Sequence, residues 1–318
     1  MMKRQEILDS KFKFNVPDSK KVRVIVHADA KNEADDQFAI VHHLLTPSFE
    51  IAGIIAGHYG IKFRMSQNEE QPVCSMSESY TEIDKLLHLM GMNDIPVQKG
   101  ATGPIDLDDN LQVSEGADFI VEEAMKDDER PLFVALQGCL TDLALAYRKN
   151  PQISNRLTAI WIGGGDYPLG GNEFNMYQDV RAAQIVFDSS IPIWQIPMST
   201  YRQVEASLAE IQDKVHACGP IGRYLFEQLV DFNTDMGLKY PDWRWPHGET
   251  WCLGDQPTIT VLLYGKDRCT YHMEYAPIIG EDMTYEMRTE GKQIRVYDYI
   301  DVRMTMEDFY SKLRICYG

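Results

Sequence analysis

The sequence predicts an α/β fold with a mainly parallel, open sheet and helices on both faces. Two observations carry this prediction: short apolar runs rich in β-branched residues recur along the chain, and segments with helical periodicity separate them. Continuous apolar strands that alternate with helices are typical of a parallel sheet covered on both sides. The chain shows no internal repeat and no low-complexity linker, so residues 1–318 are expected to form one domain.

The first half of the chain begins this alternation. The residues before the first strand are polar and predict only a short lead-in. Apolar runs predict strands at 22–27 (VRVIVH), 50–56 (EIAGIIA) and 95–98. Apolar residues at helical spacing predict helices at 35–45, 77–90 and 114–126. Gly91 is expected to end the second of these helices, because glycine readily adopts the left-handed conformation found there.

The second half continues the alternation and then changes character. Apolar runs predict strands at 132–136, 157–162 and 193–196, and helical spacing predicts helices at 141–149 and 179–187. Thr141 and Asp179 are expected to cap these two helices, and Pro257 in a first turn predicts a further helix. The stretch 234–255 is aromatic and rich in proline and glycine, so it is expected to form a long loop, which in compact domains is often functional.

The composition is that of a globular protein with an acidic surface. Of its 318 residues, 44% are hydrophobic and 25% charged, and the net charge is −17. This charge argues against nucleic acid and anionic membranes as partners, because both would repel it, and suits a small neutral or cationic substrate. No stretch reaches the roughly 18 apolar residues of a membrane helix, and no secretory signal is recognisable. The six cysteines are scattered without a C-x-x-C pair, which favours reduced thiols in a cytoplasmic chain.

Acidic residues gather directly after the first expected strand. Asp29, Glu33, Asp35 and Asp36 fall within eight residues, together with Asn32. Carboxylates this close repel one another unless a cation binds them, and Ca²⁺ and Mg²⁺ prefer oxygen ligands. The alternative is that the last two merely cap the following helix. The Asp-x-Asp loop of aspartyl-phosphate phosphatases is disfavoured, because a lysine stands in place of its second Asp.

Later segments also place polar groups after expected strands, which is where ligands bind in open α/β sheets. The turn at Gln137 is either a simple tight turn or a backbone carbonyl aimed at the site. Glu173 and Asn175 alternate with Phe174 in an expected extended segment, so both would point the same way, with groups suited to sugar hydroxyls. Hydrogen bonding within a loop is their alternative role. Asp255 either caps its helix or completes a metal site.

Taken together, these segments resemble the inosine–uridine preferring nucleoside hydrolase family, from about Val22 to Leu263. The Asp-rich loop and the Glu-Phe-Asn segment carry the resemblance; the glycine turn is less specific. The resemblance implies Ca²⁺ at the carboxyl end of the sheet and cleavage of the N-glycosidic bond of a ribonucleoside or related riboside. By position it implies metal ligation by Asp29, Asp36, Asp255 and the Gln137 carbonyl, proton abstraction by Asp29, and substrate contacts from Asn32, Asp35, His58, Glu173 and Asn175.

Several positions depart from the family pattern. His27 stands where another Asp is frequent, and His58 stands where an Asn that contacts the sugar is usual. The family's His-Gly-x-Asp-Gly motif is missing, and Ser114-Glu115-Gly116 occupies its region. Gly254 replaces a histidine that would protonate the leaving base in many members. These departures leave the expected metal ligands in place and alter the surroundings of the leaving group.

The loop before Asp255 offers substitutes for the missing histidine. His247 is a candidate proton donor, because an unperturbed imidazole titrates near neutral pH. Trp251, with Trp243 and Trp245, is a candidate wall against which a flat base would stack. The alternative is that these tryptophans form a small core under the loop.

Three functions are compatible with this sequence. The first is an N-ribosyl hydrolase, the second a hydrolase of a different glycoside on the same core, and the third a protein that binds a sugar or nucleoside without turning it over. Fold alone does not choose among them. A carboxylate base beside a metal favours catalysis, because a pure binder has no need of one. The expected partner is a small nucleoside or riboside, and the resemblance also allows a homo-oligomer.

Overall fold

An eight-stranded sheet forms the centre of the computed structural model, which describes residues 3–59, 74–105, 114–242 and 247–318. The strand order is β3-β2-β1-β4-β5-β6-β12-β9. Strand β9 at one edge pairs antiparallel with β12, and the other neighbours pair in parallel. The expected mainly parallel sheet is thus confirmed. Its strands are β1 (Val22–Ala28), β2 (Phe49–Ala56), β3 (Val97–Lys99), β4 (Leu132–Leu136), β5 (Leu157–Ile162), β6 (Ile193–Ile196), β9 (Cys269–Tyr275) and β12 (Gln293–Ile300).

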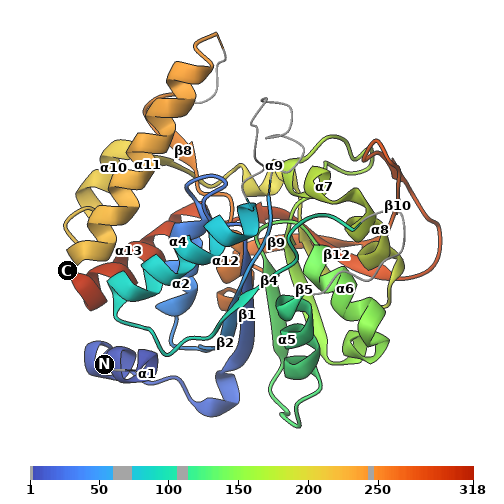
Figure 1. Cartoon of the computed structure of the whole chain (residues 1–318), viewed down its shortest axis with the longest axis horizontal. Helices are drawn as coiled ribbons and strands as arrows, with labels where there is room; N and C mark the ends of the chain where they lie inside the picture. Colours follow the sequence, from blue (N-terminus) through green and yellow to red (C-terminus); the bar gives the residue numbers. More distant parts are fainter. Residues whose placement is uncertain (1–2, 60–73, 106–113, 243–246) are drawn as a thin grey trace.

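Helices cover both faces of this sheet (Figure 1). The helices of one face are α2 (Asp36–Leu44), α4 (Ser75–Met90), α11 (Gly219–Lys239) and α13 (Val302–Tyr317), with α1 (Arg4–Lys11) and α10 (Leu208–Lys214) packed at their side. The helices of the other face are α5 (Glu115–Ala124), α6 (Thr141–Lys149) and α8 (Val180–Asp188). The shorter elements are α7 (Phe174–Gln178), α9 (Met198–Tyr201), α12 (Pro257–Leu263), β7 (Glu205–Ser207), β8 (Thr250–Cys252), β10 (Ile278–Ile279) and β11 (Tyr285–Glu286).

Strand β1 shows how the sheet separates two hydrophobic cores. Val24 and Val26 are fully buried against the helices of the first face, whereas Ile25 between them is fully buried against those of the second. Successive side chains of a strand point to opposite faces, so a continuous apolar run feeds both cores. Polar side chains that follow such a strand are therefore carried to the end of the sheet.

Some stretches differ from the expectation based on sequence. The polar lead-in contains helix α1 (Arg4–Lys11), and the segment expected to be extended is helix α7 (Phe174–Gln178). Helix α11 continues to Lys239, so the first part of the expected long loop is helical. The strands β9 and β12 and the helix α13 complete the fold beyond the region that the sequence pattern assigned.

Helix α1 is fixed to the rest of the molecule by a buried arginine. The guanidinium of Arg4 donates from Nε to the carbonyl of Leu44 at 2.7 Å and from a terminal nitrogen to the carbonyl of Thr46 at 2.8 Å. Lys312 of α13 donates to the Thr46 hydroxyl at 3.0 Å. Burial lowers the pKa of Arg4 to about 10, yet it stays charged at neutral pH. Both cations lie where helix α2 ends, the end of a helix that favours positive charge.

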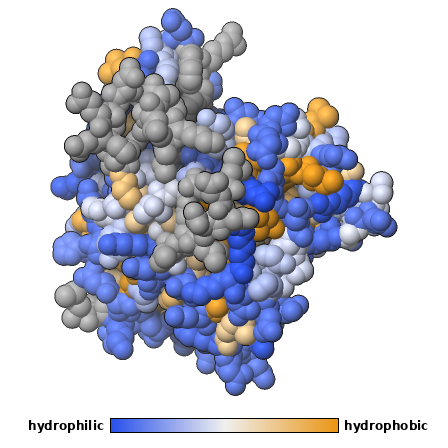
Figure 2. Space-filling model, turned by 45° about the vertical axis from the view of Figure 1, so that its right-hand side comes forward, coloured by the Kyte–Doolittle hydropathy of each residue, from blue (hydrophilic) through white to orange (hydrophobic). Residues whose placement is uncertain are grey.

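The surface is largely polar. Apart from the residues drawn in grey, the face in Figure 2 is mostly hydrophilic, with one larger hydrophobic patch and a few scattered hydrophobic residues. Among the described residues, no helix combines the length and the apolar character needed to cross a membrane.

Candidate active site

The acidic cluster lies at the carboxyl end of the sheet, between β1 and α2. Asp29 directly follows β1, Asp35 precedes α2, and Asp36 is the first residue of that helix. Asp255 comes from the segment before α12, far along the chain. Carboxylate oxygens of Asp35, Asp36 and Asp255 lie within 4.8 Å of one another. The fold thus brings two separate acidic segments together, as expected from the sequence.

Asp29 lies beside this trio. The turn after β4 leaves room for it, because a side chain at Gly138 would place its Cβ 2.8 Å from a carboxylate oxygen of Asp29. The Asp29 carboxylate is 1% exposed and accepts a hydrogen bond from the amide of Asn32 at 3.3 Å. Asn32 therefore orients Asp29, whatever it contributes to a substrate. Burial raises the pKa of both Asp36 and Asp255, and the negative charge of Asp29 raises both further.

Capping does not account for the acidic residues at the start of α2. Asp35 occupies the N-cap position, but its side chain makes no capping hydrogen bond there, and Asp36 has an oxygen without a hydrogen-bond partner among the described residues. Asp36 is 2% exposed. A buried, unpartnered carboxylate oxygen is costly unless a cation meets it. The arrangement thus favours the cation-binding interpretation over capping alone.

The cluster brings several buried carboxyl groups close together. Burial first, and mutual repulsion second, raise the pKa values of Asp36 and Asp255 well above the ordinary range of a carboxyl group. Burial and neighbouring carboxylates raise the pKa of Asp29 well above that range and that of Glu33 to about 8. Burial raises the pKa of Asp35 to about 6, although hydrogen bonds from backbone amides oppose this rise. A hard cation with oxygen ligands would remove this repulsion. The donors here are all oxygens, so they fit Ca²⁺ better than a soft metal.

The metal-free protein is expected to lose stability as the pH rises. The folded chain holds protons on Asp35 and Glu33 more tightly than the unfolded chain does, because folding raises their pKa values from 3.8 and 4.5 to about 6 and about 8. This contribution is fully present below pH 4 and is lost as the pH passes through the raised values. In chelator, the thermal unfolding midpoint should therefore fall between pH 5 and pH 8.5. Glu33→Gln should make the unfolding midpoint fall less steeply in the upper part of this pH range. An unchanged slope would contradict the raised pKa of Glu33.

The Gln137 carbonyl lies in the turn next to Gly138, the glycine that leaves room for Asp29. It follows β4, whose neighbour β1 leads to Asp29, and the Gln137 amide donates to the His27 carbonyl at 2.8 Å. The side-chain amide of Asn175 donates to the carbonyls of Gln137 and Ile162, both at 2.9 Å. Both N–H bonds of that amide are thus used within the protein. Only the side-chain oxygen of Asn175 is left to meet a ligand, as an acceptor.

Glu173 is anchored more firmly than the sequence suggested. It caps α7, and its two oxygens accept hydrogen bonds from the backbone amides of Gly164 at 2.8 Å, Met176 at 3.0 Å and Asn175 at 3.1 Å. The hydroxyl of Tyr201 donates to the same carboxylate at 3.0 Å. The expectation of an extended segment that points both polar groups the same way is therefore wrong, because the carboxylate folds back to start a helix.

His58 belongs to a buried hydrogen-bond network with Thr141 and Asp179. The expected N-cap role of Thr141 is wrong: Leu140 takes that position, and the Thr141 hydroxyl donates to Asp179 at 2.6 Å. Having given its proton to a carboxylate, the hydroxyl can only accept from His58 Nε2, which lies at 2.8 Å. Burial lowers the pKa of His58 to about 4, so the ring is neutral. Its Nδ1, which has no partner among the described residues, is then an acceptor that suits a sugar hydroxyl.

His27 and the region of the missing motif belong to a second buried network. His27 Nε2 lies 2.8 Å from a carboxylate oxygen of Asp142, and both residues are fully buried. Asp142 also accepts hydrogen bonds from the Ala101 amide and the Ser114 hydroxyl. Ser114 in addition caps α5. These residues hold the strand ends together behind Asp29 and do not add a ligand to the acidic cluster.

The candidates for the leaving group lie in different surroundings. His247 is exposed, whereas Trp243 and Trp245 fall outside the described residues. Trp251 is 1% exposed and packs edge to face on Phe232, with ring centres 5.3 Å apart. The structure thus places Trp251 in the first hydrophobic core, which favours a packing role over a stacking wall.

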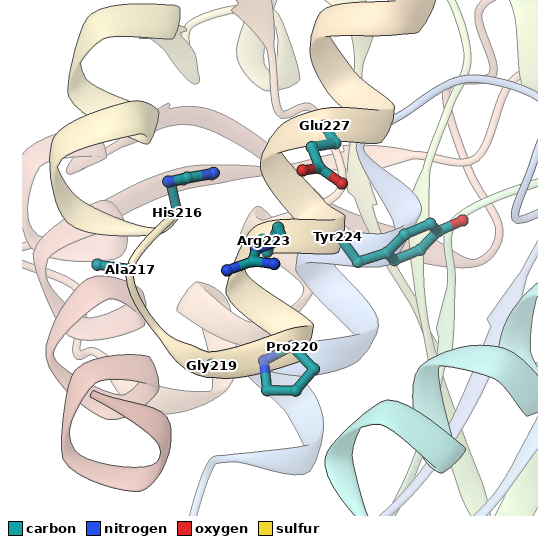
Figure 3. A pocket seen from close by; sticks show the side chains of 7 residues that line it. All are labelled: His216, Ala217, Gly219, Pro220, Arg223, Tyr224 and Glu227. Carbon is teal, nitrogen blue, oxygen red and sulfur yellow. The ribbon is translucent and has the colours of Figure 1, made fainter.

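Two cavities lie outside the acidic cluster. One of about 390 Å³ lies at the start of α11, where His216, Arg223, Tyr224 and Glu227 line it together with small residues (Figure 3). The other, of about 400 Å³, borders the acidic loop at Lys31 and is otherwise lined by α4 and the residue before it. Neither contains the carboxylates described above, so the site is defined by its converging side chains.

Comparison with known proteins supports the family suggested by the sequence. The profile of the family described as inosine-uridine preferring nucleoside hydrolase matches residues 24–307. The pyrimidine-specific ribonucleoside hydrolase RihA of Citrobacter koseri is 27% identical over 255 residues, which are 72% of this chain and 76% of that protein. The protein of the same name from Escherichia coli O1:K1 is 25% identical over 236 residues, or 66% and 70% of the two chains.

Solved structures show the same fold. A purine-preferring ribonucleoside hydrolase from Gardnerella vaginalis has a TM-score of 0.72 at 19% identity and covers 92% of this chain and 99% of its own. An inosine-uridine preferring nucleoside hydrolase from Bacillus anthracis has a TM-score of 0.64 at 15% identity and covers 93% and 99%. These likenesses confirm the expected architecture.

Proposed function

Since this chain belongs to the inosine-uridine preferring nucleoside hydrolase family, we propose that it uses Ca²⁺ to hydrolyse the N-glycosidic bond of a ribonucleoside. The family makes it a glycosidase that releases a base and a sugar; the metal and the roles of single residues are our proposal. The observation that carries it is the convergence of Asp35, Asp36 and Asp255 from two distant segments, with Asp29 beside them.

The residues present fit Ca²⁺. Asp29, Asp36, Asp255 and the Gln137 carbonyl would hold the ion, which accepts six to eight oxygen ligands with flexible geometry. One oxygen of Asp36 receives no hydrogen bond from the part of the chain that the structure describes, which supports this assignment. A bound divalent cation makes a nearby water more acidic and orients it for attack.

The chain's own side chains would then divide the remaining work. Asp29, held by Asn32, takes the proton from the attacking water as general base. Asp35 and the side-chain oxygen of Asn175 accept hydrogen bonds from the sugar hydroxyls, and His58 Nδ1 offers a third acceptor. The carboxylates also stabilise the positive charge that develops on the sugar ring in an oxocarbenium-like transition state. Glu173 holds the glycine-rich turn and α7 in place around this sugar.

A panel of ribosides tests the proposal. Purified protein would be incubated with inosine, uridine, other purine and pyrimidine ribosides, and non-nucleoside glycosides, and the free reducing sugar assayed with and without chelator. Both base classes belong in the panel, because the similar proteins include a pyrimidine-specific and a purine-preferring hydrolase. Ribonucleosides should release sugar, and chelator should abolish it. Release from other glycosides alone would favour the second function, and binding without release the third.

His247 and Trp251 are expected to respond differently to substitution. His247 is exposed, so His247→Ala should change the free energy of unfolding by less than about 0.5 kcal/mol. If it donates the proton, turnover of a natural riboside should fall far more than turnover of p-nitrophenyl riboside, whose leaving group needs no acid. Trp251→Ala empties a core site and should cost about 3–5 kcal/mol in denaturant unfolding. Equal losses of His247→Ala on both substrates would assign this histidine to binding.

A further inference from the structure

Tyr201 lies between the residues assigned to the sugar and the position of the missing histidine. It is the last residue of α9, just beyond the carboxyl end of β6, and it is half-buried. Its hydroxyl donates to Glu173 at 3.0 Å. Its ring edge lies where position 254 would project, because a Cβ built on Gly254 would be 3.0 Å from Tyr201 Cδ2. Nothing in the sequence pattern had singled this residue out.

Position 254 also lies near Asp35, which is assigned to the sugar. A Cβ at this position would be 3.5 Å from a carboxylate oxygen of Asp35. Burial raises the pKa of Asp35 to about 6, and hydrogen bonds from the backbone amides of Gly254 and Asp255 to the charged form oppose part of this rise. Position 254 therefore faces both a sugar-side carboxylate and the ring of Tyr201. A side chain there would push the Tyr201 ring back by a few tenths of an ångström, since a contact of 3.0 Å is tighter than nine in ten real Cβ contacts.

Resting on the proposed function, we propose that Tyr201 positions Glu173 through its hydroxyl and forms, with its ring, the wall of the leaving-group subsite in place of a side chain at position 254. The leaving group that suits such a wall is flat and aromatic, because the edge of an aromatic ring offers edge-to-face contacts and no charge. Glycine at position 254 and tyrosine at position 201 are then a matched pair.

Tyr201 acts by shape and by donating a hydrogen bond, not by giving up its proton. Burial and the negative charges of Glu173 and Glu33 raise its pKa well above the ordinary value for tyrosine. A tyrosinate beside these carboxylates would be strongly disfavoured, so the phenol stays protonated throughout the cycle. The hydroxyl is thus a permanent donor that fixes the Glu173 carboxylate, which in turn fixes Gly164 and α7.

Removal of the hydroxyl tests the positioning role. Tyr201→Phe should lower kcat/KM roughly tenfold or more, which is the usual loss for a hydrogen bond to a charged group. The loss should be the same for inosine and for p-nitrophenyl riboside, because both share the ribose, and the pH profile should keep its shape. Tyr317→Phe is the matched control, since that hydroxyl donates to the Met90 carbonyl instead. If Tyr201→Phe behaves like the control, or shifts the alkaline limb of the profile, the positioning role is overturned.

A double variant tests the shared space. Gly254→His should inactivate the enzyme, because its side chain meets the Tyr201 ring. Tyr201→Ala should weaken it by raising the KM for nucleosides. The combined variant should be at least tenfold more active than the product of the two single effects. On inosine its activity should fall as the pH rises through about 6.5, because the new imidazole can donate a proton only while it is protonated. Thermal unfolding midpoints identify any variant that fails to fold.

The outcomes separate this inference from the proposed function. Multiplicative effects in folded variants would show that positions 201 and 254 do not share space, and would overturn the inference while wild-type hydrolysis stands. If the wild-type protein released no sugar from any riboside, the proposed function would fail first. Binding of inosine to the wild-type and Tyr201→Ala proteins, followed by calorimetry, would then still judge the wall: equal affinities would overturn it.

Discussion

Asp29→Asn is expected to lower kcat by roughly 10²–10⁴-fold or more, which is the usual contribution of general acid–base catalysis. Asparagine keeps an oxygen in the same place but cannot accept the proton of water. The fold should survive, because the exchange preserves shape and removes a negative charge from a crowded cluster. Steady-state kinetics on the best riboside of the panel measures the loss, and circular dichroism with thermal unfolding checks the fold.

The control for this result is Asn32→Ala, which removes the hydrogen bond to Asp29 and leaves the base intact. It should cost far less than Asp29→Asn, because the carboxylate can still take the proton. Turnover of Asp29→Asn close to that of the wild type would assign the base to another group in the cluster.

Asp36→Ala should weaken Ca²⁺ binding by at least roughly 100-fold. Changes in groups that only support metal ligands typically cost roughly 10–100-fold in affinity, and Asp36 is proposed as a direct ligand with an oxygen that no described residue satisfies. Calorimetric titration of chelator-stripped protein should show one tight site in the wild type. The thermal unfolding midpoint of the wild type should also rise with Ca²⁺, because a ligand that binds the folded state stabilises it.

Asp298→Ala is the matched control for Asp36→Ala, because it removes one acidic group outside the cluster. Asp298 is half exposed and pairs with His272 at the edge of the sheet. Its variant should bind Ca²⁺ as the wild type does, which separates ligation from a general change in net charge. Absence of Ca²⁺ binding to wild-type protein at millimolar concentration would refute the metal site itself.

The fold could be predicted where burial dominates the choice of residues. A strand such as 22–28 is buried on both faces, so its apolar run is nearly continuous and easy to recognise. The pattern fails where tertiary contacts decide. Strand β9 is exposed at several positions, and β12 has exposed residues both at its start and near its end, so neither gives a continuous run. Helix α11 contains a glycine and a polar stretch near its end, which predict a loop when the packing of the helix against the rest of the fold is not known.

The site could be predicted as a set of ligand types, but not as a set of contacts. The acidic residues near positions 29 and 255 can be recognised as candidate ligands from the sequence, because clustered carboxylates repel one another unless a cation binds them. Glu173 shows the limit: its alternation with Asn175 indicates an extended segment, yet its carboxylate caps a helix and binds Tyr201. Tyr201 follows a short strand and belongs to no motif in the sequence. Its only signal is its place just after β6, at the edge where ligands bind.

Because distant segments anchor helix α2, this helix can complete its packing only late in the synthesis of the chain. Asp36 lies at one end of this helix, and its other end is held by Arg4 from α1 and approached by Lys312 from α13. Helix α13 leaves the ribosome long after α2, so α2 waits with an open apolar face while the rest of the chain is synthesised. Contacts between such distant segments slow folding, and the exposed face invites aggregation meanwhile. Nascent chains that lack α13 should therefore be clients of chaperones, and the acidic cluster should be among the last features to take shape.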